Sequence, residues 1–158
     1  MSKNRITIAQ LLQLLYNMYN KDNTKEGCQM IFNLDLESEV PIYQQIVDAI
    51  IYGIATRQLK PGEPLPSVRS LSADIGINMH TVNKAYQILK NDGFVLIHRQ
   101  KGVMVNTELP GVEPSFLEKL HANLKNLTAE AICRGLSREA LVEQVQKIYQ
   151  QMMDERRG

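Results

Sequence analysis

Two short amphipathic segments separated by a glycine constrain this chain more than any other feature of its sequence. Ser67 precedes the first segment and Gly76 ends it, whereas Asn78 precedes the second segment and Gly93 ends it. Serine and asparagine are favoured N-cap residues, and glycine is favoured where a helix ends. The second segment carries apolar residues at i, i+3, i+4 and i+7, namely Val82, Ala85, Tyr86 and Leu89. This spacing predicts two helices joined by a tight turn, which is a helix-turn-helix.

The flanking segments predict a third helix and a hairpin. Apolar residues repeat every three to four positions after Pro41, which predicts a helix with one buried face that begins near this residue. The prolines and glycine of residues 59–66 end that helix. Two runs rich in β-branched and apolar residues, 94–98 and 102–106, flank the polar tip Arg-Gln-Lys and predict a hairpin. Helix, helix-turn-helix and hairpin follow one another in the order of a winged helix.

The last third of the chain has helical periodicity again. Ser115 and Glu118 form the S-x-x-E pattern of a capping box at the start of one helix. Gly135 is expected to break that helix, and Ser137 is expected to cap the next one. Two helices cannot bury both of their apolar faces against each other, so this tail predicts dimerisation through a second copy of the chain.

These patterns divide the chain into three parts. Residues 1–33 are predicted to be an N-terminal extension of one helix and a linker, residues 34–106 a winged helix-turn-helix domain, and residues 107–158 a helical dimerisation tail. The expected fold class is therefore mainly α with a small β-hairpin wing, followed by a C-terminal helical hairpin.

Positive charge is concentrated in the middle of the chain. Residues 57–105 carry seven Lys and Arg against three Asp and Glu, although the whole chain has a net charge of only +1. A basic segment between mildly acidic flanks is typical of a protein that meets a polyanion there, although a solvated protein surface gives the same distribution.

Other function classes find no support in the sequence. No apolar run approaches the roughly 18 residues of a membrane span. Cys28 and Cys133 match no metal or redox spacing and favour a reducing cytoplasm. No nucleophile motif, phosphate-binding loop or metal-ligand spacing is present. We therefore expect a cytoplasmic protein that is not an enzyme and has no cofactor, metal site or membrane contact.

The outer face of the predicted helix 79–92 is suited to double-stranded DNA. With the apolar residues turned inward, helical geometry turns polar side chains outward, where Asn and Gln can pair with adenine and Lys or His can donate to guanine. A helix N-terminus favours a phosphate oxygen, and basic residues before the helix and at the hairpin tip can reach the backbone or minor groove. The candidate contacts from this geometry are Arg69, Asn78, His80, Thr81, Asn83, Lys84, Gln87, Arg99 and Lys101.

The same residues carry a resemblance to a known family. PGEPLPSVRSL (residues 61–71) and NMHTVNKAYQILKNDG (residues 78–93) are similar to the signature of the GntR family of bacterial transcription regulators, and the short tail resembles its YtrA-like subfamily. The likeness implies a homodimeric repressor of a nearby operon. Members of the family usually respond to a small-molecule effector, whereas the fifty or so residues after the wing are too few for a typical separate effector domain. It implies DNA contacts at Arg69, Met79, His80, Thr81, Asn83, Gln100, Lys101 and Gly102.

Two departures from the subfamily fall in these contacts. Residues 78–81 read NMHT where the subfamily often has NPNT, and Gln100 stands where it often has glycine. A different base sequence is therefore expected to be read. The alternative is a winged-helix module that binds a protein instead of DNA, which needs no polar outer face on its second helix. Weaker binding to all duplexes after Arg69→Ala and Lys84→Ala would favour DNA.

Overall fold

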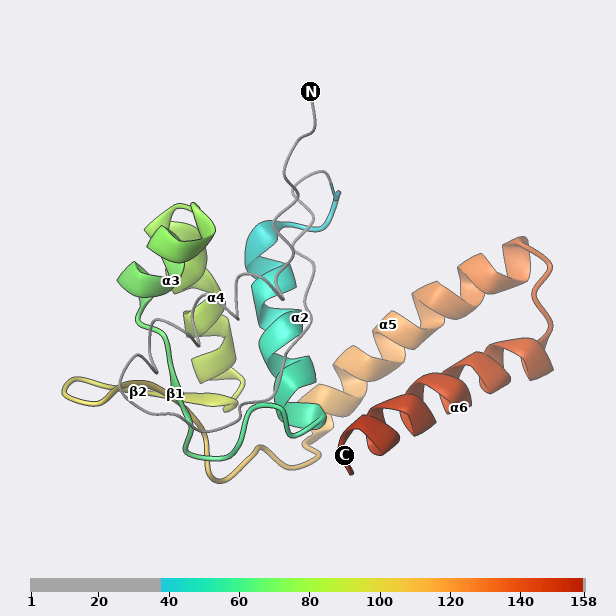
Figure 1. The fold of residues 1–158 in the computed structure, drawn as a ribbon. Helices are drawn as coiled ribbons and strands as arrows, with labels where there is room; N and C mark the ends of the chain where they lie inside the picture. Colours follow the sequence, from blue (N-terminus) through green and yellow to red (C-terminus); the bar gives the residue numbers. More distant parts are fainter. Residues whose placement is uncertain (1–37, 158) are drawn as a thin grey trace. The chain divides into compact units, whose positions relative to one another are not determined.

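The computed structural model describes residues 38–157, and they form two compact units, the first ending at Leu109 and the second beginning at Pro110 (Figure 1). The predicted extension over residues 1–33 lies outside the described residues. The fold of the described chain is mainly helical with one small antiparallel sheet, which confirms the predicted fold class.

Three helices form the first unit, and two of their boundaries are set by short polar caps. Helix α2 spans Ile42–Ala55, α3 spans Val68–Ile75 and α4 spans Met79–Asn91. The Ser67 hydroxyl accepts the backbone N–H of Ser70 at 3.0 Å and caps α3, as predicted. The last turn of α3 passes into Gly76, whose φ of +65° favours glycine. Pro41 lies at the N-cap position of α2, one residue before the first turn in which it was expected.

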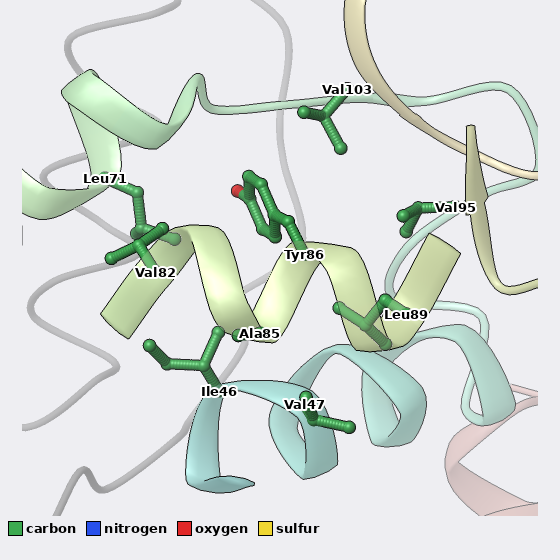
Figure 2. Close-up of a cluster of buried hydrophobic side chains, with 9 residues drawn as sticks. All are labelled: Ile46, Val47, Leu71, Val82, Ala85, Tyr86, Leu89, Val95 and Val103. Atoms are coloured by element: carbon green, nitrogen blue, oxygen red, sulfur yellow. The ribbon is translucent and has the colours of Figure 1, made fainter. Parts of the chain in front are cut away.

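The inner face of α4 is the centre of the core. Its four predicted core side chains, Val82, Ala85, Tyr86 and Leu89, are 0% exposed. Figure 2 shows Ile46 and Val47 of α2 on one side of this face, and Leu71, Val95 and Val103 contributed by α3 and the sheet. The Tyr86 hydroxyl donates a 2.8 Å hydrogen bond to the Pro66 carbonyl. Burial raises the pKa of Tyr86, so its hydroxyl keeps the proton that it donates.

The sheet contains the predicted hairpin and one further strand. Strand β2 (Val95–His98) pairs antiparallel with β3 (Gly102–Val105), with Val95 opposite Val105 and His98 opposite Gly102. The two-residue strand β1 (Pro64–Leu65) pairs with the other edge of β3, so the strand order is β1-β3-β2.

The expectation of a wing made of a hairpin alone was therefore incomplete. The proline-rich segment was predicted only to end a helix. Pro64 is compatible with a strand here because β1 is an edge strand, which needs few backbone donors. Two backbone hydrogen bonds just before β1 hold the segment against β3, namely Val105 N–H to Glu63 O at 2.9 Å and Gly62 N–H to Val105 O at 3.0 Å.

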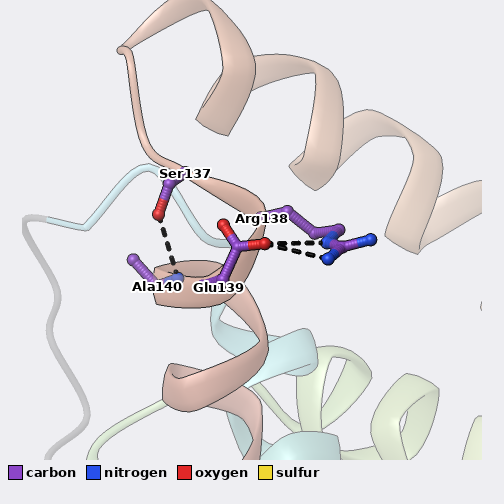
Figure 3. Close-up of polar contacts among 4 residues, drawn as sticks. All are labelled: Ser137, Arg138, Glu139 and Ala140. Atoms are coloured by element: carbon purple, nitrogen blue, oxygen red, sulfur yellow. Dashed lines mark hydrogen bonds and ion pairs between the residues drawn. The ribbon is translucent and has the colours of Figure 1, made fainter.

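The second unit consists of two helices, α5 (Pro114–Cys133) and α6 (Arg138–Glu155). Gly135 separates them with a φ of +76°, and the Ser137 hydroxyl caps α6 by accepting the Ala140 N–H at 3.2 Å, as predicted (Figure 3). The predicted capping box at Ser115 is wrong. Helix α5 begins at Pro114, one residue earlier, because proline's fixed φ and missing N–H suit the first helical position.

Helices α5 and α6 leave most of their apolar residues in solvent. Within residues 110–157, Ala131 alone is buried. Leucines recur on α5 at intervals of three and four residues, and apolar residues follow similar intervals on α6. The exposed members of these stripes are Leu117, Leu120, Leu124, Leu127, Val142, Val145, Ile148 and Tyr149.

We expect Tyr86→Phe to lower the free energy of unfolding by about 1–2 kcal/mol, because it leaves the Pro66 carbonyl without its donor inside the core. Chemical denaturation of the full chain measures this change. The matched control is Tyr43→Phe at the half-buried Tyr43 of α2, whose hydroxyl takes part in no hydrogen bond within residues 38–157, so its loss should change stability little. Equal stability of the two variants would contradict the structural role of the Tyr86 hydrogen bond.

Candidate nucleic-acid interface

Helix α4 presents a continuous polar side to solvent. The predicted contacts His80, Asn83 and Lys84 are exposed, and Gln87 continues their row one turn further along. All four lie opposite the fully buried inner face, as expected from an advance of about 100° per residue. The core therefore fixes the rotation of α4 about its own axis and so determines which side chains can meet a ligand.

The start of α4 is held by a side-chain cap. The Asn78 side-chain oxygen accepts the backbone N–H of His80 at 2.8 Å, which orients the first turn. The Met79 side chain is 51% exposed and Thr81 is half-buried. These residues occupy the end of the helix whose backbone dipole favours an anion, and Asn78 already uses its side-chain oxygen within the protein.

The side chain of Lys84, another predicted contact, lies against an aromatic ring of a neighbouring helix. Its ammonium nitrogen lies 3.5 Å from the centroid of the Tyr43 ring, which belongs to α2. Tyr43 belongs to the apolar stripe of α2 and is half-buried beside the core. Sequence periodicity could not reveal this pair, because periodicity relates residues within one helix, and these two residues belong to different helices far apart in the chain.

Arg69 lies in the first turn of α3, exposed to solvent. The Ser67 cap fixes the start of this helix two residues before Arg69. Within residues 38–157, Arg69 takes part in no ion pair. Its guanidinium is thus available to a polyanion.

The hairpin tip carries two further positive charges. Arg99, Gln100 and Lys101 form the exposed turn between β2 and β3. Gly102 follows with a φ of +75°, a conformation that other residues adopt only with strain, although a Cβ there would meet no atom within 4 Å. The backbone conformation, more than space, accounts for this glycine. Neither basic residue forms an ion pair in the described part of the chain.

The described part of the chain brings no three His, Cys, Asp or Glu residues together in a group that could hold a metal ion. Among its helices, none is long and apolar enough to cross a membrane. The exposed polar and basic residues of α3, α4 and the wing form the candidate site described above.

The family comparison matches the unit that carries this cluster. The model of the bacterial regulatory proteins of the gntR family matches residues 42–105, from the start of α2 to the end of β3. The HTH-type transcriptional repressor YtrA of Bacillus subtilis is 32% identical over 120 residues, which cover 75% of this chain and 92% of that protein. The uncharacterized HTH-type transcriptional regulator YhcF of the same species is 30% identical over 108 residues, covering 68% and 88%.

Solved structures agree in fold. A protein described as a transcriptional antiterminator from Listeria monocytogenes superposes with a TM-score of 0.71 at 27% identity, covering 77% of this chain and 91% of that one. YtrA from Sulfolobus acidocaldarius, a GntR-family transcription factor, has a TM-score of 0.52 at 40% identity, covering 61% and 96%.

We expect Asn78→Ala to cost about 1 kcal/mol of stability, because the first turn of α4 loses its cap, whereas Asn78→Asp should keep it. Equilibrium denaturation of both variants measures the difference. If Asn78→Ala is as stable as the natural chain, the cap does not contribute to holding the start of α4. DNA titration of the equally stable Asn78→Asp protein then tests the contact separately, because the added negative charge should repel a phosphate.

Proposed function

Because this chain belongs to the GntR family of bacterial regulatory proteins, we propose that it acts as a homodimeric repressor bound to operator DNA beside the genes that it controls. The family membership makes it a DNA-binding transcription regulator. Its action as a repressor on a nearby operon is supported by its likeness to the YtrA repressor. A regulator of this kind works where the chromosome lies, in the cytoplasm.

The division of α4 into a buried face and a polar face is the observation that carries this proposal. A major groove accepts one helix, and a recognition helix contacts base edges with residues near its N-terminus. His80, Asn83 and Gln87 would then face the base edges, with Asn78 and Thr81 near a phosphate. The wing residues Arg99, Gln100, Lys101 and Gly102 would follow the neighbouring backbone or minor groove.

The tail supports the proposed dimer. Exposed leucines and isoleucines on α5 and α6 would be costly in water as a continuous apolar surface, and a second copy offers the same surface in return. Two tails of two helices each can form a four-helix bundle around these stripes. A dimer of this kind presents two recognition helices to half-sites about one helical turn apart, about 10 base pairs centre to centre.

Binding to a duplex from the upstream region of its own gene should fall steeply with salt, because phosphate contacts release counterions. We expect Arg69→Ala to weaken binding to every duplex and to reduce the slope of log affinity against log salt by about 1. Fluorescence anisotropy over a salt series measures both. The control is Arg138→Ala, an exposed arginine of α6 that should leave binding unchanged.

The result that contradicts DNA recognition is the absence of a salt-sensitive complex between the natural chain and any promoter fragment. The winged-helix unit would then have to bind a protein instead.

A charge placed in the α5 stripe tests the dimer. We expect Leu124→Asp to shift the protein from dimer to monomer in sedimentation at micromolar concentration, because an unpaired carboxylate cannot be buried cheaply. Operator affinity should fall with it, since one recognition helix is left for two half-sites. Lys125→Asp, one residue further and outside the stripe, is the control that should remain dimeric. A natural chain that sediments as a monomer would refute this assembly.

A further inference from the structure

The geometry of Lys84 points to a role different from base reading. Its ammonium lies 3.5 Å from the centroid of the Tyr43 ring. We propose that Tyr43 is a positioning residue that holds Lys84 on the flank of α4 as a fixed contact to a DNA phosphate. This inference rests on the proposed function and assigns part of the interface to α2, a helix outside the helix-turn-helix.

The first step is the direction in which Lys84 leans. His80 and Gln87 lie close to the middle line of the outer face, because seven residues advance a helix by almost two full turns. Lys84 follows His80 by four residues, slightly more than one helical turn, so it lies to one side of this line. Asn83 follows His80 by three residues, slightly less than one turn, so it lies to the other side. The contact with Tyr43 shows that the side of Lys84 is the side of α2. When a helix lies in a groove, residues on its flanks face the phosphate backbone at the groove walls.

The second step is the chemistry of the ammonium group. A cation is attracted to the face of an aromatic ring, and this attraction limits the conformations of an otherwise flexible side chain. The ring engages one side of the group, so N–H donors remain on the other sides. A lysine that is kept near Tyr43 cannot extend freely toward base edges, but a phosphate contact requires only a point charge at the correct place.

The third step is that no carboxylate neutralises this charge. Within residues 38–157, Lys84 forms no ion pair. The acidic residue of α2, Asp48, instead accepts the side-chain amide of Gln44 at 2.8 Å. The Tyr43 ring thus orders Lys84 without cancelling its charge, which is the property that a phosphate-binding lysine needs.

Four variants of the full chain separate the lysine from the ring that holds it. Lys84→Met keeps the stem and removes the charge, whereas Lys84→Arg keeps a cation. Tyr43→Leu removes the ring, and its matched control Tyr43→Phe retains the ring. Anisotropy titrations would use an operator that the natural chain binds, a set of operators with single base-pair changes, and unrelated DNA. Thermal unfolding checks that each variant is folded.

We expect Lys84→Met to weaken binding to all these duplexes by the same factor, about tenfold, and to lower the salt slope by about 1. Tyr43→Leu should weaken binding about two- to fivefold with the slope unchanged, because the charge is retained but no longer held. Tyr43→Phe keeps the ring and should recover most of the affinity that Tyr43→Leu loses, and Lys84→Arg should keep the natural salt slope because a cation remains. Loss of discrimination at one base pair in Lys84→Met, or natural affinity in Tyr43→Leu, would overturn the proposal.

A measurement without DNA tests the positioning on its own. The protons on the Lys84 ε-carbon should show an upfield ring-current shift in the NMR spectrum, which Tyr43→Leu abolishes and Tyr43→Phe keeps. Absence of this shift in the natural chain overturns the positioning role even if operator binding is normal. If the shift is present but the natural chain binds no DNA, the proposed function fails, and the phosphate contact fails with it.

Discussion

Burial of one side of α4 is the constraint on which the rest of this structure depends. An isolated helix of 13 residues is marginal in water, so α4 owes its stability to its packing. Each large side chain on the buried face contributes about 1.5–3 kcal/mol relative to leaving it exposed. The same packing fixes the rotation of the helix, and with it the direction of every polar side chain on the outer side. The packing of this face therefore both stabilises α4 and orients the polar side chains on its outer side.

One side-chain hydrogen bond inside this core connects α4 with the segment that follows β1. Tyr86 reaches from α4 to the Pro66 carbonyl, between β1 and α3. The carbonyl belongs to a proline-rich segment that pairs with β3, the central strand that also forms the wing. The Tyr86 hydroxyl, which burial keeps protonated, thus links α4 to the sheet that contains the hairpin. A fixed arrangement of α4 and the hairpin is needed if both elements are to contact one duplex.

The sequence predicted features that depend on neighbouring residues and missed those that depend on distant ones. Caps at Ser67, Asn78 and Ser137 follow from local hydrogen bonding, and the inner face of α4 follows from its periodicity. Strand β1 exists only because β3 pairs with it, about forty residues later. Its two residues, Pro64 and Leu65, are followed by Pro66 and gave no signal of a strand in the sequence. The contact between Tyr43 and Lys84 is equally non-local. At Ser115, two local rules competed, and the preference of Pro114 for the first helical position prevailed.

The outer side chains of α4 are exposed to solvent, whereas those of its inner side are fully buried in the core. Exchanges at His80, Asn83 or Gln87 should therefore leave folding almost untouched. A lineage with this architecture can explore new target sequences one substitution at a time without passing through unfolded intermediates. After gene duplication, the divergence of such regulators would then be limited mainly by whether suitable promoters arise. Whether the protein tolerates the substitutions would matter much less.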